Sequence, residues 1–186
     1  MRKKDYEKEQ RVKEAVIKLI LEEGFEGASI AKIAREAGVS PATVYIYYDS
    51  KEQMLASIYR EYAGDTYDYL MGRVRADMDG RELVSSLIRG YYDYITQNTQ
   101  IFRFVEQCSH CPTLSCEAYD DPCRAFEFLD RMKEQGLLRR YSNESLAAIL
   151  FSPVKAISQD FPAADSRADQ LLEELIQIVQ DALLLL

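Results

Sequence analysis

Hydroxyl-bearing side chains are concentrated in the stretch GVSPATVYIYYDSKEQM, residues 38–54. Serine, threonine and tyrosine hydroxyls and a lysine ammonium group all form hydrogen bonds with the phosphate oxygens of a nucleic acid. Small apolar side chains beside them can contact the methyl group of a thymine base. The stretch therefore predicts a nucleic-acid contact surface, and its candidate residues are Ser40, Pro41, Ala42, Thr43, Tyr45, Tyr47 and Lys51.

A second group of reactive side chains lies in CSHCPTLSCEAYDDPC, residues 108–123, which contains all four cysteines and the one histidine of the chain. Its candidate ligands are Cys108, His110, Cys111, Cys116 and Cys123. Zinc sites usually use two close ligand pairs, and here only Cys108 and Cys111 form one. We therefore predict no metal site and interpret the thiols as incidental. A metal- or thiol-based sensor that uses the four cysteines remains the alternative function.

Enzymatic chemistry finds little support in the remaining residues. With one histidine, the chain has no nucleophile-elbow or phosphate-loop motif and no paired carboxylates in a recognisable cleft. We therefore predict no catalytic residues, no cofactor and no enzyme activity.

The hydroxyl-rich stretch is predicted to lie on the last of three helices. Apolar residues at helical spacing predict an amphipathic helix over about residues 6–23 that ends at Gly24. Ser29 can cap a second, short helix that ends at Gly38. Ser40 can cap the third, so that two short helices flank a tight turn.

Two short helices joined by a tight turn are the arrangement that lays a recognition helix in the major groove of DNA. In the third helix, Val44 and Tyr48 lie four residues apart and are expected to pack on the first two helices, whereas Ser40, Thr43 and Tyr47 lie on another face. The alternative is a helical hairpin whose tyrosines only fill a core. Tyr47 has no apolar face to join at helical periodicity, which favours DNA binding.

The rest of the chain is predicted to be helical as well. Ser50 and Gln53 resemble a capping box that opens a long helix, which is expected to end at Asp79 and Gly80. Further helices are predicted at about residues 81–97, 99–109, 122–136, 143–158 and 166–185, with a kink or an end at Pro153. No alternating strand pattern occurs, so the fold class is predicted to be all-α, a three-helix head followed by a helical bundle.

The charge distribution is compatible with a DNA partner although the formal net charge is −8. Residues 1–60 contain 11 Lys/Arg and 10 Asp/Glu, which gives +1, and residues 61–186 contain 12 and 21, which gives −9. Six of the basic residues are among the first 13, where an arm could reach a polyanion. No apolar run approaches the roughly 18 residues that span a bilayer. We therefore expect a cytoplasmic protein without a membrane partner.

The segment GFEGASIAKIAREAGVSPATVYIYYDSKEQML, residues 24–55, resembles the DNA-binding head of TetR-type transcriptional repressors. The resemblance implies that the candidate residues of the third helix contact DNA and that Ser29 and Lys32 approach phosphates. Asp49 departs from the pattern, because similar proteins often carry a basic or amide residue there. The resemblance also implies a DNA-binding domain in residues 1–50 and an effector-binding and dimerisation domain in residues 51–186.

The resemblance further implies a repressor that is released from a palindromic operator in double-stranded DNA by a small-molecule effector. Aromatic residues in the middle of the chain could line the effector cavity, although ordinary core packing is the simpler interpretation of any one of them. These candidates are Tyr62, Tyr91, Tyr94, Phe102, Phe104 and Phe128.

The last predicted helix, DQLLEELIQIVQDALLLL, carries two adjacent apolar seams. One seam is enough to dock a helix on its own domain, and the second needs a partner. A symmetric homodimer is the expected solution, and a monomer with a fully buried terminal helix is the alternative. One seam is Leu171, Leu175, Ile178, Ala182 and Leu185; we assign the dimer interface to the other, which is Leu172, Ile176, Val179, Leu183 and Leu186.

Overall fold

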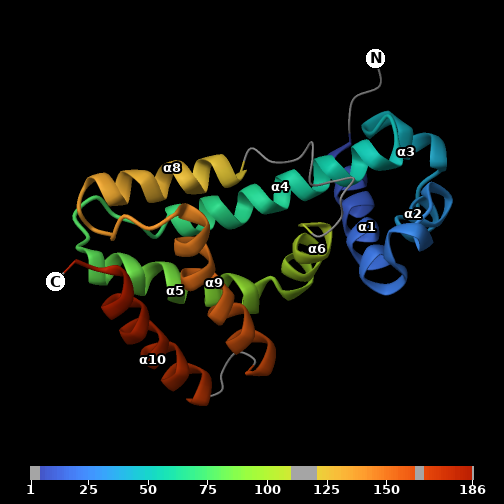
Figure 1. The fold of residues 1–186 in the computed structure, drawn as a ribbon. Coiled ribbons are helices and arrows are strands. Elements are labelled where there is room, and N and C mark those ends of the chain that lie inside the picture. The colour runs from blue at the N-terminus through green and yellow to red at the C-terminus, as the bar shows by residue number, and fades with distance from the viewer. Residues whose placement is uncertain (1–4, 110–120, 162–165, 186) are drawn as a thin grey trace. The chain divides into compact units, whose positions relative to one another are not determined.

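The computed structural model describes residues 5–109, 121–161 and 166–185, and every regular element in these ranges is a helix (Figure 1). In chain order the helices are α1 (Tyr6–Gly27), α2 (Ile30–Glu36), α3 (Pro41–Tyr47), α4 (Lys51–Met71), α5 (Gly80–Gln97), α6 (Thr99–Ser109), α8 (Asp121–Glu134), α9 (Asn143–Asp160) and α10 (Ser166–Leu183). The all-α fold class is thus confirmed. None of the described helices is long and apolar enough to cross a membrane.

The helices pack into two compact units. The first contains α1, α2, α3, the part of α4 up to Ala63, and α6 from Gln100 onward. The second contains the end of α4 from Gly64, together with α5, α8, α9 and α10. These units divide the chain differently from the expected domains 1–50 and 51–186, because α6 packs with the N-terminal helices although it lies far from them in sequence.

The core of the first unit joins α2 and α3 to α1. α1 contacts both of them, and α2 contacts α3. Ile20 on α1, Ile33 on α2 and Val44 on α3 have no exposed surface. Each apolar side chain of this size contributes about 1.5–3 kcal/mol when it is buried. The helix–turn–helix pair is therefore held on α1 by apolar packing.

Serine caps and glycine turns set the limits of these helices. A serine side-chain oxygen accepts a hydrogen bond from the backbone N–H three residues later, at 3.3 Å for Ser29, 3.2 Å for Ser40 and 3.0 Å for Ser50. Gly24 and Gly38 adopt positive φ angles of 73° and 64°, a left-handed conformation that costs other residues energy. The predicted helix starts after Ser29 and Ser40 and the end of α2 before Gly38 are thus confirmed. The predicted end of α1 at Gly24 is not, because the helix is only interrupted there and continues to Gly27.

One further predicted helix end was wrong. α4 ends at Met71, ahead of the expected stop, and Asp79 begins α5 because its carboxylate accepts the Glu82 N–H at 2.8 Å in a capping box. The helix predicted over residues 143–158 is confirmed as α9, which does not end at Pro153 but continues to Asp160. Its buried face continues across the proline with Leu150 and Val154, so packing holds the helix on both sides of the missing N–H donor.

The core of the second unit is formed chiefly by α5, α9 and α10, which contact one another, and α8 contacts α9. Gln180 is a buried polar residue of α10, and its amide bonds to the Arg81 carbonyl oxygen and the Ser85 hydroxyl, each at 3.0 Å. These hydrogen bonds fix the register of α10 on α5, because a buried amide without partners is costly.

The assignment of the dimer seam on α10 was wrong. Leu172, Ile176, Val179 and Leu183 are at most 5% exposed, because they pack inside their own unit; Leu186 lies outside the described residues. The neighbouring seam faces outward, with Ile178 65% and Leu185 59% exposed and Ala182 also exposed, while Leu171 and Leu175 are half-buried. This outward seam, Leu171, Leu175, Ile178 and Ala182 on α10 with Leu185 just after the helix, is the face on which a partner could pack.

Candidate nucleic-acid interface

The turn between α2 and α3 places α3 at the surface of the first unit. Gly38 gives the chain its left-handed turn, and the Val39 N–H donates to the Ala34 carbonyl oxygen at 2.9 Å. α3 then begins at Pro41, whose missing N–H costs nothing at the first helical position. A short helix is thereby presented after a tight turn, as a recognition helix requires.

α3 has one buried face and one exposed face. Val44 is 0% exposed and Tyr48, which follows its last turn, is 4% exposed, so both belong to the core as predicted. Pro41 and Ala42 are exposed, and the exposed fraction is 54% for Tyr45. The outward face is therefore small and apolar at its start and aromatic in its last turn, which suits contact with base edges and thymine methyl groups.

Ile46 also lies on the outward face, with 38% of its surface exposed. The sequence analysis did not select it. Its position four residues after Ala42 was the available signal, since residues four apart share one side of a helix.

Hydroxyl groups at the two helix starts are accessible but already make local hydrogen bonds. Ser40 Oγ lies 2.9 Å from Thr43 Oγ1 and caps α3, and Ser29 caps α2. Both serines are exposed and Thr43 is half-buried. A phosphate oxygen only accepts, so a hydroxyl contacts it by donating its single proton. Ser29 can donate in this way, and in the Ser40–Thr43 pair the hydroxyl that does not donate to the other keeps its proton for a phosphate.

Tyr47 occupies a different position from the one expected. It is half-buried against the core, and its hydroxyl donates to the Asp5 carbonyl oxygen at 2.9 Å and accepts from the Asp5 N–H at 3.1 Å. The side chain thus joins α3 to the residue that caps α1. The periodicity argument failed here because it considered only the helices and not the segment before α1.

Two predicted lysines also form bonds inside the unit. The Lys51 ammonium group donates to the Phe25 carbonyl oxygen, and the Lys32 ammonium group pairs with the Glu23 carboxylate. Arg11 and Arg35 are exposed and have no ion pair among the described residues. The sequence analysis did not select these two arginines, and only the structure distinguishes them from the paired lysines.

The Tyr48 hydroxyl is buried and makes no hydrogen bond with the described residues. Burial raises the pKa of this hydroxyl, and the carboxylates of Glu9 and Glu61 raise it further. A buried polar group without a partner reduces stability, so Tyr48 is a costly core residue in a unit that is otherwise apolar inside.

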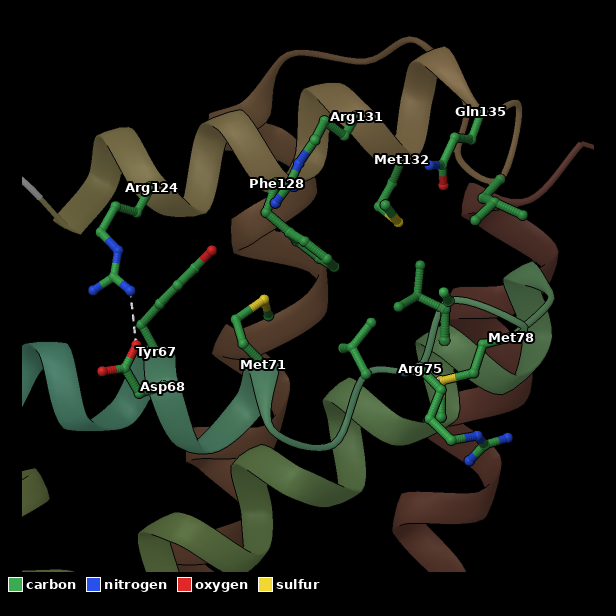
Figure 2. Close-up of a pocket in the computed structure, with 14 residues that line it drawn as sticks. Tyr67, Asp68, Met71, Arg75, Met78, Arg124, Phe128, Arg131, Met132 and Gln135 are labelled. Carbon is green, nitrogen blue, oxygen red and sulfur yellow. Dashed lines mark hydrogen bonds and ion pairs between the residues drawn. The ribbon is translucent and has the colours of Figure 1, made fainter.

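The aromatic residues proposed for an effector cavity are distributed over both units, and all six are buried. Tyr62 and Phe104 belong to the core of the first unit. In the second unit, Tyr91 packs edge-on against Phe151 with ring centres 4.9 Å apart, and Tyr94 packs against Tyr69. Phe128 lines a cavity of about 410 Å³ in the second unit (Figure 2).

Of the cysteine cluster, the structure describes only the Cys108 side chain, which is buried in the core of the first unit. His110, Cys111 and Cys116 lie outside the described residues, as does the side chain of Cys123. Among the residues that are described, no three His, Cys, Asp or Glu side chains are grouped so that they could hold a metal ion.

Known proteins resemble the first unit in sequence. Residues 14–58 match the family model "Bacterial regulatory proteins, tetR family". The HTH-type transcriptional regulator BetI of Rhizobium meliloti is 38% identical over 76 residues, which are 41% of this chain and 37% of that protein. The fatty acid metabolism regulator protein of Bacillus subtilis is 25% identical over 88 residues, which are 47% of this chain and 45% of that protein. The chain thus matches less than half the length of these curated relatives.

Solved structures resemble the whole chain in fold. A TetR family transcription regulator from Marinobacter aquaeolei VT8 has a TM-score of 0.77 and 25% identity, and the match covers 98% of each chain. The regulator FadR of Bacillus subtilis in complex with stearoyl-CoA has a TM-score of 0.64 and 15% identity, covering 92% of this chain and 97% of FadR. At 15% identity, the likeness to FadR shows a shared fold only.

Proposed function

Because the chain is of the TetR type in its N-terminal helices and in its all-helical fold, we propose that it is a DNA-binding transcriptional regulator and not an enzyme. The observation that carries the proposal is the division of α3 into a core face and an exposed face. Val44 and Tyr48 hold the helix on the unit, which leaves Pro41, Ala42 and Tyr45 free to meet the major groove. The regulator would act in the cytoplasm, where its operator is accessible.

The regulator acts as a homodimer on a palindromic operator. Support comes from the outward seam of α10, where Ile178 and Leu185 are more than half exposed, and from Ile149 on α9, which is 38% exposed. α9 and α10 contact each other, so these side chains belong to neighbouring helices. Exposed apolar side chains favour association, and a twofold dimer would present two α3 helices to half-sites about one helical turn of DNA apart.

A small molecule bound in the second unit releases the regulator from DNA, so the protein is a repressor in its free state. An effector shifts such an equilibrium only as far as it prefers the arrangement that does not bind DNA. FadR shares the fold and was solved with stearoyl-CoA, which supports a small-molecule effector without identifying it.

Fluorescence anisotropy with duplexes from the DNA upstream of the gene, at two salt concentrations, tests the proposal. The variant is Tyr45→Ala, because this side chain is exposed and its removal leaves the core intact. We expect at least roughly tenfold weaker binding to the specific duplex, the loss typical of one specific contact. Tyr141→Ala is the control, since Tyr141 is 48% exposed in the other unit. Equally poor binding of all three proteins to every duplex would refute the proposal.

A further inference from the structure

The cavity of the second unit has the size of a small-molecule site. It lies between the last turns of α4, the segment that joins α4 to α5, and α8 (Figure 2). Its volume of about 410 Å³ falls within the range of roughly 300–1,000 Å³ that ligand pockets occupy. All of its lining residues belong to the second unit.

One part of the cavity wall is apolar and flexible. Phe128 and Met132 from α8 and Leu83 from α5 line it and are each at most 8% exposed, so they form its buried apolar floor. Met71 and Met78 add two more thioether side chains. Methionine adapts its shape to an apolar surface, so this wall suits a flexible hydrocarbon body better than a rigid polar one.

The other part of the wall is cationic, with Arg75, Arg124 and Arg131. Arg124 is neutralised by Asp68 at 2.7 Å and lies over the Tyr67 ring, and Arg75 pairs with a carboxylate at 3.1 Å. Arg131 makes no ion pair within the described part of the chain. It is an exposed residue, and it is the arginine of this wall whose charge is available to a ligand that enters from solvent.

In Figure 2 the Arg131 guanidinium group and the Tyr67 hydroxyl both extend toward the place where the Phe128 side chain leaves α8. A guanidinium and a hydroxyl donor together suit the oxygens of a carboxylate or a phosphate. The chain carries a net charge of −8, which repels anions in general, so a local cationic site is needed if an anion is to bind.

We propose that this cavity binds an amphipathic anion, with its carboxylate or phosphate head at Arg131 and Tyr67 and its apolar body along Phe128, Met71 and Met132. The ligand's role as the effector rests on the proposed function, whereas its chemical class rests on the cavity wall alone. A neutral or cationic amphiphile would form no ion pair with Arg131, which is exposed at this wall. A small hydrophilic anion would add no apolar contact to the half-buried Met71 and Met78.

The five methionines of the chain allow a direct test, because Met71, Met78 and Met132 line the cavity while Met54 is buried in the core of the first unit. The full-length protein is labelled with ¹³C at the methionine methyl groups and titrated with decanoate, decyl phosphate, decanol and decyltrimethylammonium, each below its micelle concentration. We expect saturable shifts of the three cavity signals with the Met54 signal unmoved. The two anions should bind at least roughly tenfold more tightly than the other probes, and the tighter anion identifies the head group.

The variant Arg131→Gln tests the head-group site, and Arg140→Gln is its control because Arg140 is exposed in the same unit and does not line the cavity. Arg131→Gln should weaken decanoate binding at least roughly tenfold and leave decanol binding unchanged. The proposal would be overturned by unshifted cavity signals, by decanol binding as tightly as decanoate, or by unaltered decanoate binding in Arg131→Gln.

Anisotropy with operator DNA, with and without saturating decanoate, separates the two proposals. Cavity shifts in a protein that binds no DNA would support the anion site and contradict the regulator. DNA binding in a protein whose cavity signals never shift would support the regulator and contradict the anion site.

Discussion

Two adjacent tyrosines, Tyr47 and Tyr48, should respond in opposite directions to the same chemical change. Replacement by phenylalanine keeps each ring and removes only the hydroxyl group. The Tyr48 hydroxyl is buried without a partner among the described residues, whereas the Tyr47 hydroxyl forms two hydrogen bonds with the Asp5 backbone. Each residue is therefore the matched control for the other.

The expected magnitudes follow from these contacts. A buried hydroxyl without a hydrogen bond costs about 1–3 kcal/mol, so Tyr48→Phe should raise the free energy of unfolding by about that amount. Each hydrogen bond of Tyr47 contributes about 0.5–1.5 kcal/mol net, so Tyr47→Phe should lower it by about 1–3 kcal/mol. A change of 1 kcal/mol moves the melting temperature of a chain of this length by about 2–4 °C.

Urea unfolding followed by circular dichroism at 222 nm measures both variants against the wild type, and thermal melts give an independent order of stability. We expect Tyr48→Phe to be the most stable and Tyr47→Phe the least. A destabilised Tyr48→Phe would refute the reasoning, because it would mean that the hydroxyl has a favourable partner in the folded protein. Equal losses in both variants would do the same.

Three further predictions concern pH, the turn and the dimer. Burial raises the pKa of Tyr48 above its unfolded value of about 10, so above that pH the unfolded chain loses the phenolic proton before the folded chain does, and the free energy of unfolding falls as the pH rises. Urea unfolding between pH 9 and 11 should therefore show a steeper loss for the wild type than for Tyr48→Phe, and parallel curves would count against this reasoning. Gly38→Ala should lower the free energy of unfolding, measured in thermal melts, by about 1–2 kcal/mol through backbone strain alone, because φ is 64° and an added Cβ would meet no atom closer than 3.5 Å. Gly72→Ala, at a glycine without positive φ, should cost less than about 0.5 kcal/mol in the same thermal melts, and equal costs would exclude backbone strain as the cause. Ile178→Glu should weaken dimerisation by roughly 2 kcal/mol or more in analytical ultracentrifugation, because it would bury a carboxylate in the interface, whereas Glu174→Gln should not weaken it. An unchanged dimer in Ile178→Glu would exclude this face of α10 as the dimer interface.

The sequence by itself determined the helices and their first turns. Ser29, Ser40 and Gly38 act through neighbours three or four residues away, so local chemistry is enough to predict them. The inward face of α3 was also predictable, because Val44 and Tyr48 follow helical periodicity. The resemblance of residues 24–55 then indicated the kind of surface that α3 presents.

Tertiary structure decided which side chains are available for function. Lys51 and Tyr47 read as DNA contacts, yet each bonds to backbone atoms of a segment more than 20 residues away, which no local pattern can reveal. The two seams of α10 are equally apolar in sequence, and only the packing of α5 and α9 determines that Leu172 is buried and Ile178 exposed. Periodicity defines the faces of a helix, whereas the direction of each face depends on helices that are distant along the chain.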